Sequence, residues 1–157
     1  MPLAGDGLGW ALVPLDALAD ELGVTVMTLD LPAGVDGFYE ATGRTIGVSS
    51  SLTSDNARAA TRVHELAHAL VRLDHDEQDP QLDYAEEELV AESVAYTVIA
   101  GGLGIDMTGA SVPYLASWAE RAPLATVEAA ANLIDRLARR IEGALERDRD
   151  AHAEAPA

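Results

Sequence analysis

The chain has 157 residues, nearly half of them apolar, which is enough for one domain with a buried core. Its 27 acidic residues outnumber ten basic ones, all arginine, and the net charge of −17 argues against unaided binding of nucleic acid or an anionic membrane. The compositional bias of a GC-rich or salt-adapted source explains the same acidity equally well. Because cysteine is absent, disulfides and thiolate metal sites are excluded.

The sequence indicates neither a targeting segment nor a membrane span. The first 25 residues contain four acidic residues and no basic one, unlike a signal peptide. No apolar run approaches the roughly 18 residues that a membrane helix needs. We therefore expect a cytoplasmic protein with no membrane partner.

The first third of the chain mixes helical and alternating patterns. Periodic leucines predict a short amphipathic helix over residues 12–22. Alternation and β-branched residues predict a strand over residues 24–29. A hairpin is expected from strands at 38–40 and 45–48, joined by a turn at 41–44.

The rest of the chain is predicted to be mostly helical. The expected elements are a helix over residues 56–73, an acidic connection over 74–83, a helix over 84–100, a short helix over 113–119 and a last helix over 126–145. We interpret the acidic connection as a solvated link rather than a lid, and residues 147–157 as a disordered tail. The patterns together predict one α+β domain over residues 1–146, mostly helical, with a sheet of two or three strands.

The strongest chemical signal is the segment His64-Glu65-Leu66-Ala67-His68. Residues four apart in a helix lie about 40° apart around its axis, so both imidazoles can bind one metal ion. Glu65 is rotated away from His64 and can act as a base on water beside the metal. Chance produces this pattern in about one such sequence in a hundred. The alternative is two partly buried histidines that cap or pack against the helix.

A catalytic zinc site needs a third protein ligand and an open position. His75 falls in the adjoining loop and His152 in the tail, so an acidic residue of the next helix is a better candidate. Glu88 and Glu92 share a face that is otherwise apolar, where a carboxylate needs a partner. Periodicity alone does not exclude Glu87, whose own stripe is also apolar.

These residues carry a resemblance to a known family. The segment His64-Glu65-Leu66-Ala67-His68, followed by Glu88-Leu89-Val90-Ala91-Glu92, resembles the gluzincin-type site of ImmA/IrrE metallopeptidases. The likeness covers most of the chain and is greatest to the C-terminal peptidase-like domain of ArdC-type antirestriction proteins. Residues 9–14 resemble the junction at which those proteins leave their N-terminal DNA-binding domain. We expect no such DNA-binding domain in this protein, so the resemblance does not carry antirestriction activity with it.

The resemblance implies a zincin-like fold and one zinc ion held by His64, His68 and Glu88, with Glu65 as the general base. It also implies that Glu92 supports the metal site without touching the ion. Such enzymes usually stabilise the oxyanion with a tyrosine or histidine, and the candidates in this chain are Tyr39, Tyr84 and His75.

Three functions follow from these observations as hypotheses. The first is a zinc-dependent endopeptidase that hydrolyses a specific protein substrate, such as a repressor or another regulator. The second is a non-proteolytic zinc-containing module of an antirestriction system or mobile element, and the third is a helical domain without metal. Glu65 favours the first, because a purely structural site needs no base. We expect a protein or peptide partner and no nucleic acid bound by this chain alone; the oligomeric state does not follow from the sequence.

Overall fold

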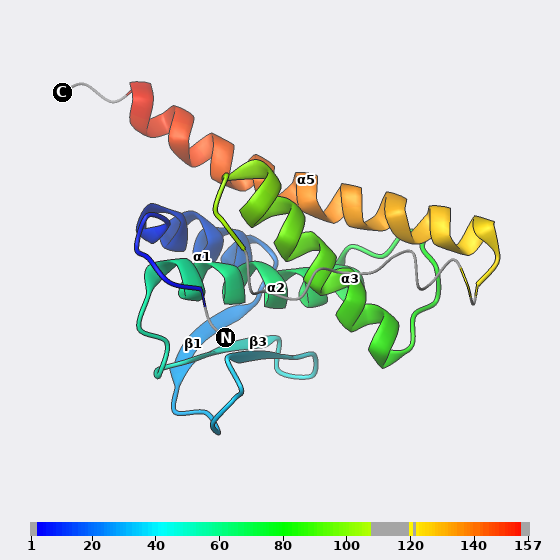
Figure 1. Ribbon diagram of the computed structural model, residues 1–157, viewed down its shortest axis with the longest axis horizontal. Helices are drawn as coiled ribbons and strands as arrows, with labels where there is room; N and C mark the ends of the chain where they lie inside the picture. The colour runs from blue at the N-terminus through cyan, green and yellow to red at the C-terminus, as the bar shows by residue number, and fades with distance from the viewer. Residues whose placement is uncertain (1–2, 108–119, 121, 155–157) are drawn as a thin grey trace.

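The computed structural model describes residues 3–107, 120 and 122–154 (Figure 1). Its elements follow in chain order: the 3-10 turn η1 (Gly9–Ala11), α1 (Leu12–Glu21), β1 (Thr25–Leu29), β2 (Gly37–Glu40), β3 (Thr45–Ser49), α2 (Asp55–Leu73), α3 (Tyr84–Tyr96), the π-helical turn η2 (Thr97–Gly102) and α5 (Leu124–Glu154). The fold is α+β, mostly helical with one small sheet, as the sequence predicted. The short helix expected at 113–119 lies outside the described residues.

The sheet contains three strands in the order β1-β3-β2. The expected hairpin is present, with β2 antiparallel to β3, whereas β1 pairs with β3 in parallel. In this register Val26, Ile46 and Tyr39 form one row across the sheet. Because Ile46 is fully buried, this row identifies the face that packs on the helices.

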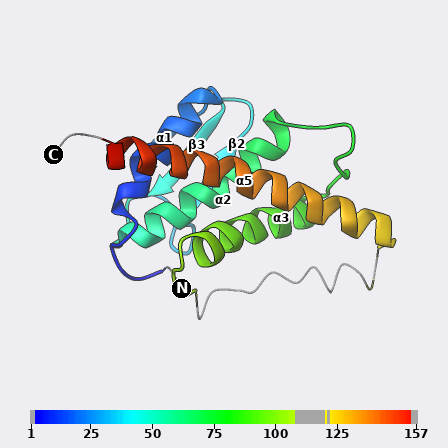
Figure 2. The same cartoon turned by 90° about the horizontal axis from the view of Figure 1, so that it is seen from above.

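Helix α2 is the central element, with the sheet on one side and α5 on the other (Figure 1). Seen from above, α5 crosses α1, α2 and α3 (Figure 2). The core is made by side chains that are almost inaccessible to solvent, including Leu66 and Leu70 of α2, Val90 and Val94 of α3, and Leu133, Leu137 and Ile141 of α5. Burial of a leucine or isoleucine contributes about 1.5–3 kcal/mol, so these contacts hold α2 and α3 together.

The sheet packs closely on α2 at Gly37 in β2. A Cβ atom at this position would lie 2.6 Å from Cγ2 of Thr61 and 3.4 Å from Cγ of Glu65. Only glycine fits such a contact without moving the helix. Gly37 therefore brings β2 against the face of α2 that carries Glu65.

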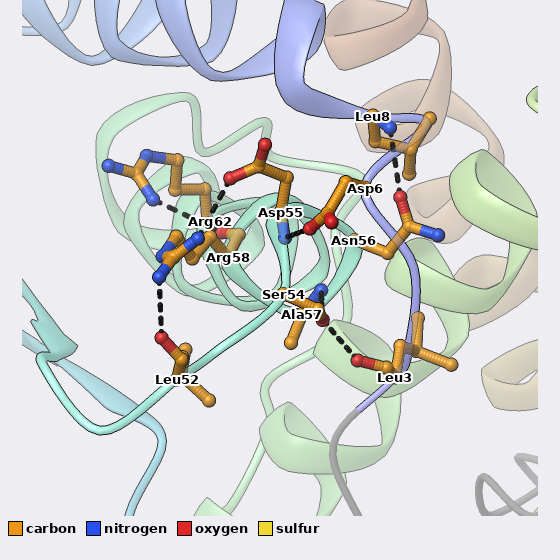
Figure 3. Close-up of polar contacts among 10 residues, drawn as sticks. All are labelled: Leu3, Asp6, Leu8, Leu52, Ser54, Asp55, Asn56, Ala57, Arg58 and Arg62. Atoms are coloured by element: carbon orange, nitrogen blue, oxygen red, sulfur yellow. Dashed lines mark hydrogen bonds and ion pairs between the residues drawn. The ribbon is translucent and has the colours of Figure 1, made fainter.

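The beginning of α2 is tied to the N-terminal strap, which we define as residues 3–8 (Figure 3). The Asn56 side chain accepts a hydrogen bond from the backbone of Leu8 at 2.8 Å and donates one to the carbonyl of Ala4 at 3.0 Å. Ser54 caps the helix by accepting from the Ala57 backbone, and its hydroxyl donates to the carbonyl of Leu3. Each contact with the strap joins residues about 50 positions apart, so the sequence pattern did not reveal them.

The connection between α2 and α3 is fastened to α5. The Arg136 guanidinium contacts both carboxylate oxygens of Asp79, at 2.7 and 2.8 Å, and donates to the Asp74 carbonyl at 2.9 Å. This pairing lowers the pKa of Asp79. The connection is thus anchored to α5 by hydrogen bonds and an ion pair, while most of its residues are exposed.

Helix α5 is longer than the sequence predicted. It begins at Leu124 rather than Thr126 and continues to Glu154, so residues 147–154 are helical where a disordered tail was expected. This segment contains two alanines and two arginines, which favour helix, and a cation–π contact at 5.2 Å joins Arg149 to Trp10. In the described part of the chain, no helix has the combined length and hydropathy for a bilayer span.

Candidate metal centre

Two histidines and one glutamate converge where α2 packs on α3. The Nε2 atom of His64 lies 2.9 Å from one carboxylate oxygen of Glu88, and Nε2 of His68 lies 3.0 Å from the other. One ligand atom from each of the three residues can be chosen so that all lie within 4.8 Å of one another. The helical spacing predicted that the histidines would share a face, and the structure places them so.

The donor set of this cluster fits a zinc ion. Two imidazole nitrogens and one carboxylate are the ligands that zinc takes in open catalytic sites, where a fourth position is left for water or substrate. The His68 side chain is only 11% exposed, whereas that of Glu88 is 36% exposed. The cluster is therefore anchored in the core on one side and open to solvent on the other.

The imidazole of His68 is oriented by Glu87. Its Nδ1 atom lies 2.9 Å from Oε1 of Glu87, which directs Nε2 toward the centre of the cluster. The second oxygen of Glu87 accepts a hydrogen bond from Arg72 at 3.3 Å. The sequence left Glu87 open as a ligand, and the structure instead places it behind His68. Its apolar helical stripe was the available signal that this acid points inward.

The charges of the cluster shift its titration. Hydrogen bonds from His64 and then His68 hold the pKa of Glu88 well below its usual range. Burial lowers the pKa of His68, but its hydrogen bonds to Glu88 and Glu87 outweigh that effect and raise it to about 9. The site therefore favours positive charge facing Glu88, and a bound cation satisfies the same preference.

Glu65 lies on a different side of α2, next to β2. Its residue exposure is 6%, and burial raises the pKa of its carboxyl, partly offset by His64 and His68. A carboxylate with a raised pKa is suited to accept and then release a proton near neutral pH. The structure thus places a buried acid near enough to the two histidines for their charges to lower its pKa.

The remaining candidate residues differ in their access to this centre. The Tyr39 hydroxyl is buried and has no hydrogen-bond partner in the described part of the chain, and burial raises its pKa. Tyr84 is 81% exposed and begins α3 one turn before Glu88. His75 is exposed in the connection that follows α2. Glu92 is half-buried one turn after Glu88, and within residues 3–107, 120 and 122–154 it makes no hydrogen bond or ion pair.

Comparison with protein-family profiles supplies independent evidence on this region. Residues 19–100 match the IrrE N-terminal-like domain, Peptidase_M78. The match covers just over half of the chain and includes the sheet, α2 and all of α3. No curated protein and no solved structure matches the chain. The chain belongs to the family of IrrE N-terminal-like peptidase domains.

Proposed function

We propose that this protein is a zinc-dependent endopeptidase that hydrolyses a peptide bond in a specific protein, such as a repressor or another regulator. The observation that carries the proposal is the convergence of His64, His68 and Glu88 beside the buried carboxylate of Glu65. Membership of a peptidase family supports the reaction class. A metal site used only for structure has no need of a buried base beside it.

In this proposal each residue of the cluster has a separate task. His64, His68 and Glu88 hold the ion, which makes the site gluzincin-like, and Glu87 keeps Nε2 of His68 directed at it. When bound, zinc polarises the scissile carbonyl and favours attack by water near neutral pH. Glu65 takes a proton from the attacking water and passes it to the leaving amine. Burial of Glu65 raises its pKa, which makes its carboxylate a stronger base for the first transfer.

The substrate backbone is proposed to bind along β2. This strand is at the end of the sheet order and, among the described residues, pairs only with β3. An exposed strand edge can accept an extended peptide through main-chain hydrogen bonds. Because Gly37 of β2 packs against the Glu65 side chain, a peptide on this edge would lie close to the base.

Of the three candidates for stabilising the oxyanion, Tyr84 has the best access. Its side chain is exposed and shares a helical face with Glu88. The Tyr39 hydroxyl is buried, and His75 lies on the connection rather than on either helix of the cluster. The relationship that we propose to ArdC-type antirestriction proteins is limited to their peptidase-like domain.

The proposal is tested with wild-type protein, Glu65→Gln and the control Glu128→Gln, which alters an exposed position of α5. Zinc content is measured by metal analysis, and cleavage is followed with a proteome-derived peptide library. We expect one zinc per chain in all three proteins and a loss of cleavage of about 10²- to 10⁴-fold for Glu65→Gln alone.

Each other outcome contradicts part of the proposal. Absence of zinc from the wild-type protein would contradict the proposed metal centre. Zinc binding without cleavage by the wild-type protein would favour the non-proteolytic zinc module. Undiminished cleavage by Glu65→Gln would assign the base to another residue.

A further inference from the structure

The Glu87 carboxylate connects two successive turns of α2. One oxygen lies 2.9 Å from Nδ1 of His68, and the other accepts from Nη2 of Arg72 at 3.3 Å. His68 and Arg72 are four residues apart and therefore lie on the same face of the helix. Both side chains contact the same side chain of α3 across the interface between the two helices.

The two ends of this arrangement differ in burial. The Glu87 side chain is only 12% exposed, whereas that of Arg72 is 53% exposed. A carboxylate in such a place needs partners for both oxygens, because unsatisfied buried charge is costly. If Arg72 were removed, one oxygen would have no partner in the described part of the chain, and the carboxylate could turn away from His68.

We propose that Arg72 is a positioning residue for the metal centre. It fixes the rotation of the Glu87 carboxylate, Glu87 fixes the His68 ring, and the ring presents Nε2 to the ion. This inference rests on the proposed function, because it requires that the cluster bind zinc. In the described part of the chain, no hydrogen bond or ion pair joins Arg72 to His64, His68 or Glu88, so we assign its effect to the Glu87 carboxylate.

Two effects of Arg72 on zinc affinity oppose each other. Its positive charge draws electron density from Glu87 and so weakens the support that Glu87 gives to His68. Its hydrogen bond holds Glu87 in the orientation that the support requires. Because the guanidinium is half exposed, solvent screens its charge strongly. Solvent has less effect on the geometry of its hydrogen bond to Glu87. The orienting effect is the larger, and removal of Arg72 lowers zinc affinity.

The experiment measures zinc affinity by competition with a chromophoric chelator. The proteins are wild type, Arg72→Ala, Arg72→Lys, Glu87→Ala and the double variant with alanine at both positions. The control is Arg139→Ala, which removes an exposed arginine paired with Asp135 on α5. The thermal midpoint of each metal-free protein and the visible spectrum of each cobalt-substituted protein are recorded alongside.

We expect Arg72→Ala to weaken zinc binding about three- to tenfold, between the effect of an exposed ion pair and that of a direct partner of a ligand. Arg72→Lys should recover part of this loss, and Arg139→Ala should cause none. In the Glu87→Ala background, Arg72→Ala should add nothing, because the residue through which it acts is already gone. The cobalt spectrum should change in Arg72→Ala and return toward wild type in Arg72→Lys.

The inference is overturned if Arg72→Ala leaves zinc affinity unchanged, or if its effect is the same with and without Glu87. Either result would leave the metal centre intact, since wild-type protein would still bind zinc. Failure of the wild-type protein to bind zinc would instead overturn the proposed function and this inference with it. Should Arg72→Ala fail to fold, Arg72→Lys in the two Glu87 backgrounds provides the same comparison.

Discussion

The two halves of α2 both contain buried polar side chains, but these side chains have different kinds of partner. At the N-terminal end, Ser54 and Asn56 bond to main-chain groups of the N-terminal strap (Figure 3). In the C-terminal half, His64 and His68 contact the carboxylates of α3. One cluster uses neutral backbone groups, and the other uses side chains that can exchange protons.

This difference separates a structural cluster from a chemical one. Backbone amides and carbonyls stay neutral at every accessible pH, so the contacts of Asn56 only hold the strap to the helix. The histidines and acids respond to a cation or a substrate, because their charge can change. Burial of a polar residue alone would not have distinguished the two ends, since Asn56 is 6% and His68 8% exposed.

The largest expected effect concerns the ligand that α3 contributes. We expect Glu88→Ala to weaken zinc binding by on the order of a hundred- to a thousandfold, about one ligand's share of the 10–16 kcal/mol typical of four-ligand sites. Zinc raises the thermal midpoint of a protein that binds it only when folded, so chelation should lower this midpoint for wild type and not for the variant. Competition titration and scanning calorimetry check both. A larger loss for Glu87→Ala would reverse the assignment.

Glu87 should have the next largest effect. Its replacement by alanine removes the hydrogen bond that orients His68, and loss of such a partner typically lowers metal affinity about 10- to 100-fold. Glu128→Ala, at an exposed position of α5, is the matched control and should leave affinity unchanged. Zinc competition distinguishes the two variants. Equal affinities would mean that Glu87 has no part in the centre.

The strap end of α2 should respond in stability rather than in zinc binding. Asn56→Ala leaves the buried Leu8 amide without its acceptor, which costs about 1–3 kcal/mol of unfolding free energy. Asn132→Ala, at an exposed position of α5, should change stability by less than about 0.5 kcal/mol. Urea denaturation of the metal-free proteins measures both. A loss of zinc affinity by folded Asn56→Ala would break the separation between the two ends.

Glu92 should have a smaller effect than Glu87. The resemblance to gluzincins implies that it supports the metal site, yet among the described residues it makes no hydrogen bond. We expect Glu92→Ala to lower zinc affinity about two- to fivefold, below the usual range for a direct partner of a ligand. The same chelator competition measures this change. A loss as large as that of Glu87→Ala would show that Glu92 contacts a ligand once zinc is bound.

We expect this chain not to bind single-stranded DNA. Nucleic-acid affinity depends mainly on basic residues that neutralise phosphates, and this chain has ten arginines against 27 acidic residues. Most of the arginines in the described structure pair with acids, as Arg58, Arg62 and Arg136 do. An anisotropy titration at about 0.15 M salt should show no binding in the micromolar range. Submicromolar binding that weakens steeply with salt would contradict this expectation.

Much of the local structure could be predicted because it depends on neighbours in sequence. The α2 helix was expected at 56–73 and spans Asp55–Leu73, since its apolar residues recur at helical spacing. The hairpin of β2 and β3 was expected because two short strand patterns are joined by a four-residue turn. The predicted C-terminal end of α5 was wrong, because Trp10, which contacts Arg149, is far away in the sequence. The parallel pairing of β1 with β3 also depends on distant residues.

By itself the sequence determined that His64 and His68 share one face of a helix with Glu65 beside them, because helical geometry follows from spacing alone. Only the tertiary structure decided which of Glu87 and Glu88 contacts both imidazoles. These neighbours differ by about 100° around α3, and both of their helical stripes are apolar. The packing of α3 on α2 turns Glu88 toward both imidazoles and Glu87 behind one of them. That orientation is set by contacts between helices, which no pattern within one helix contains.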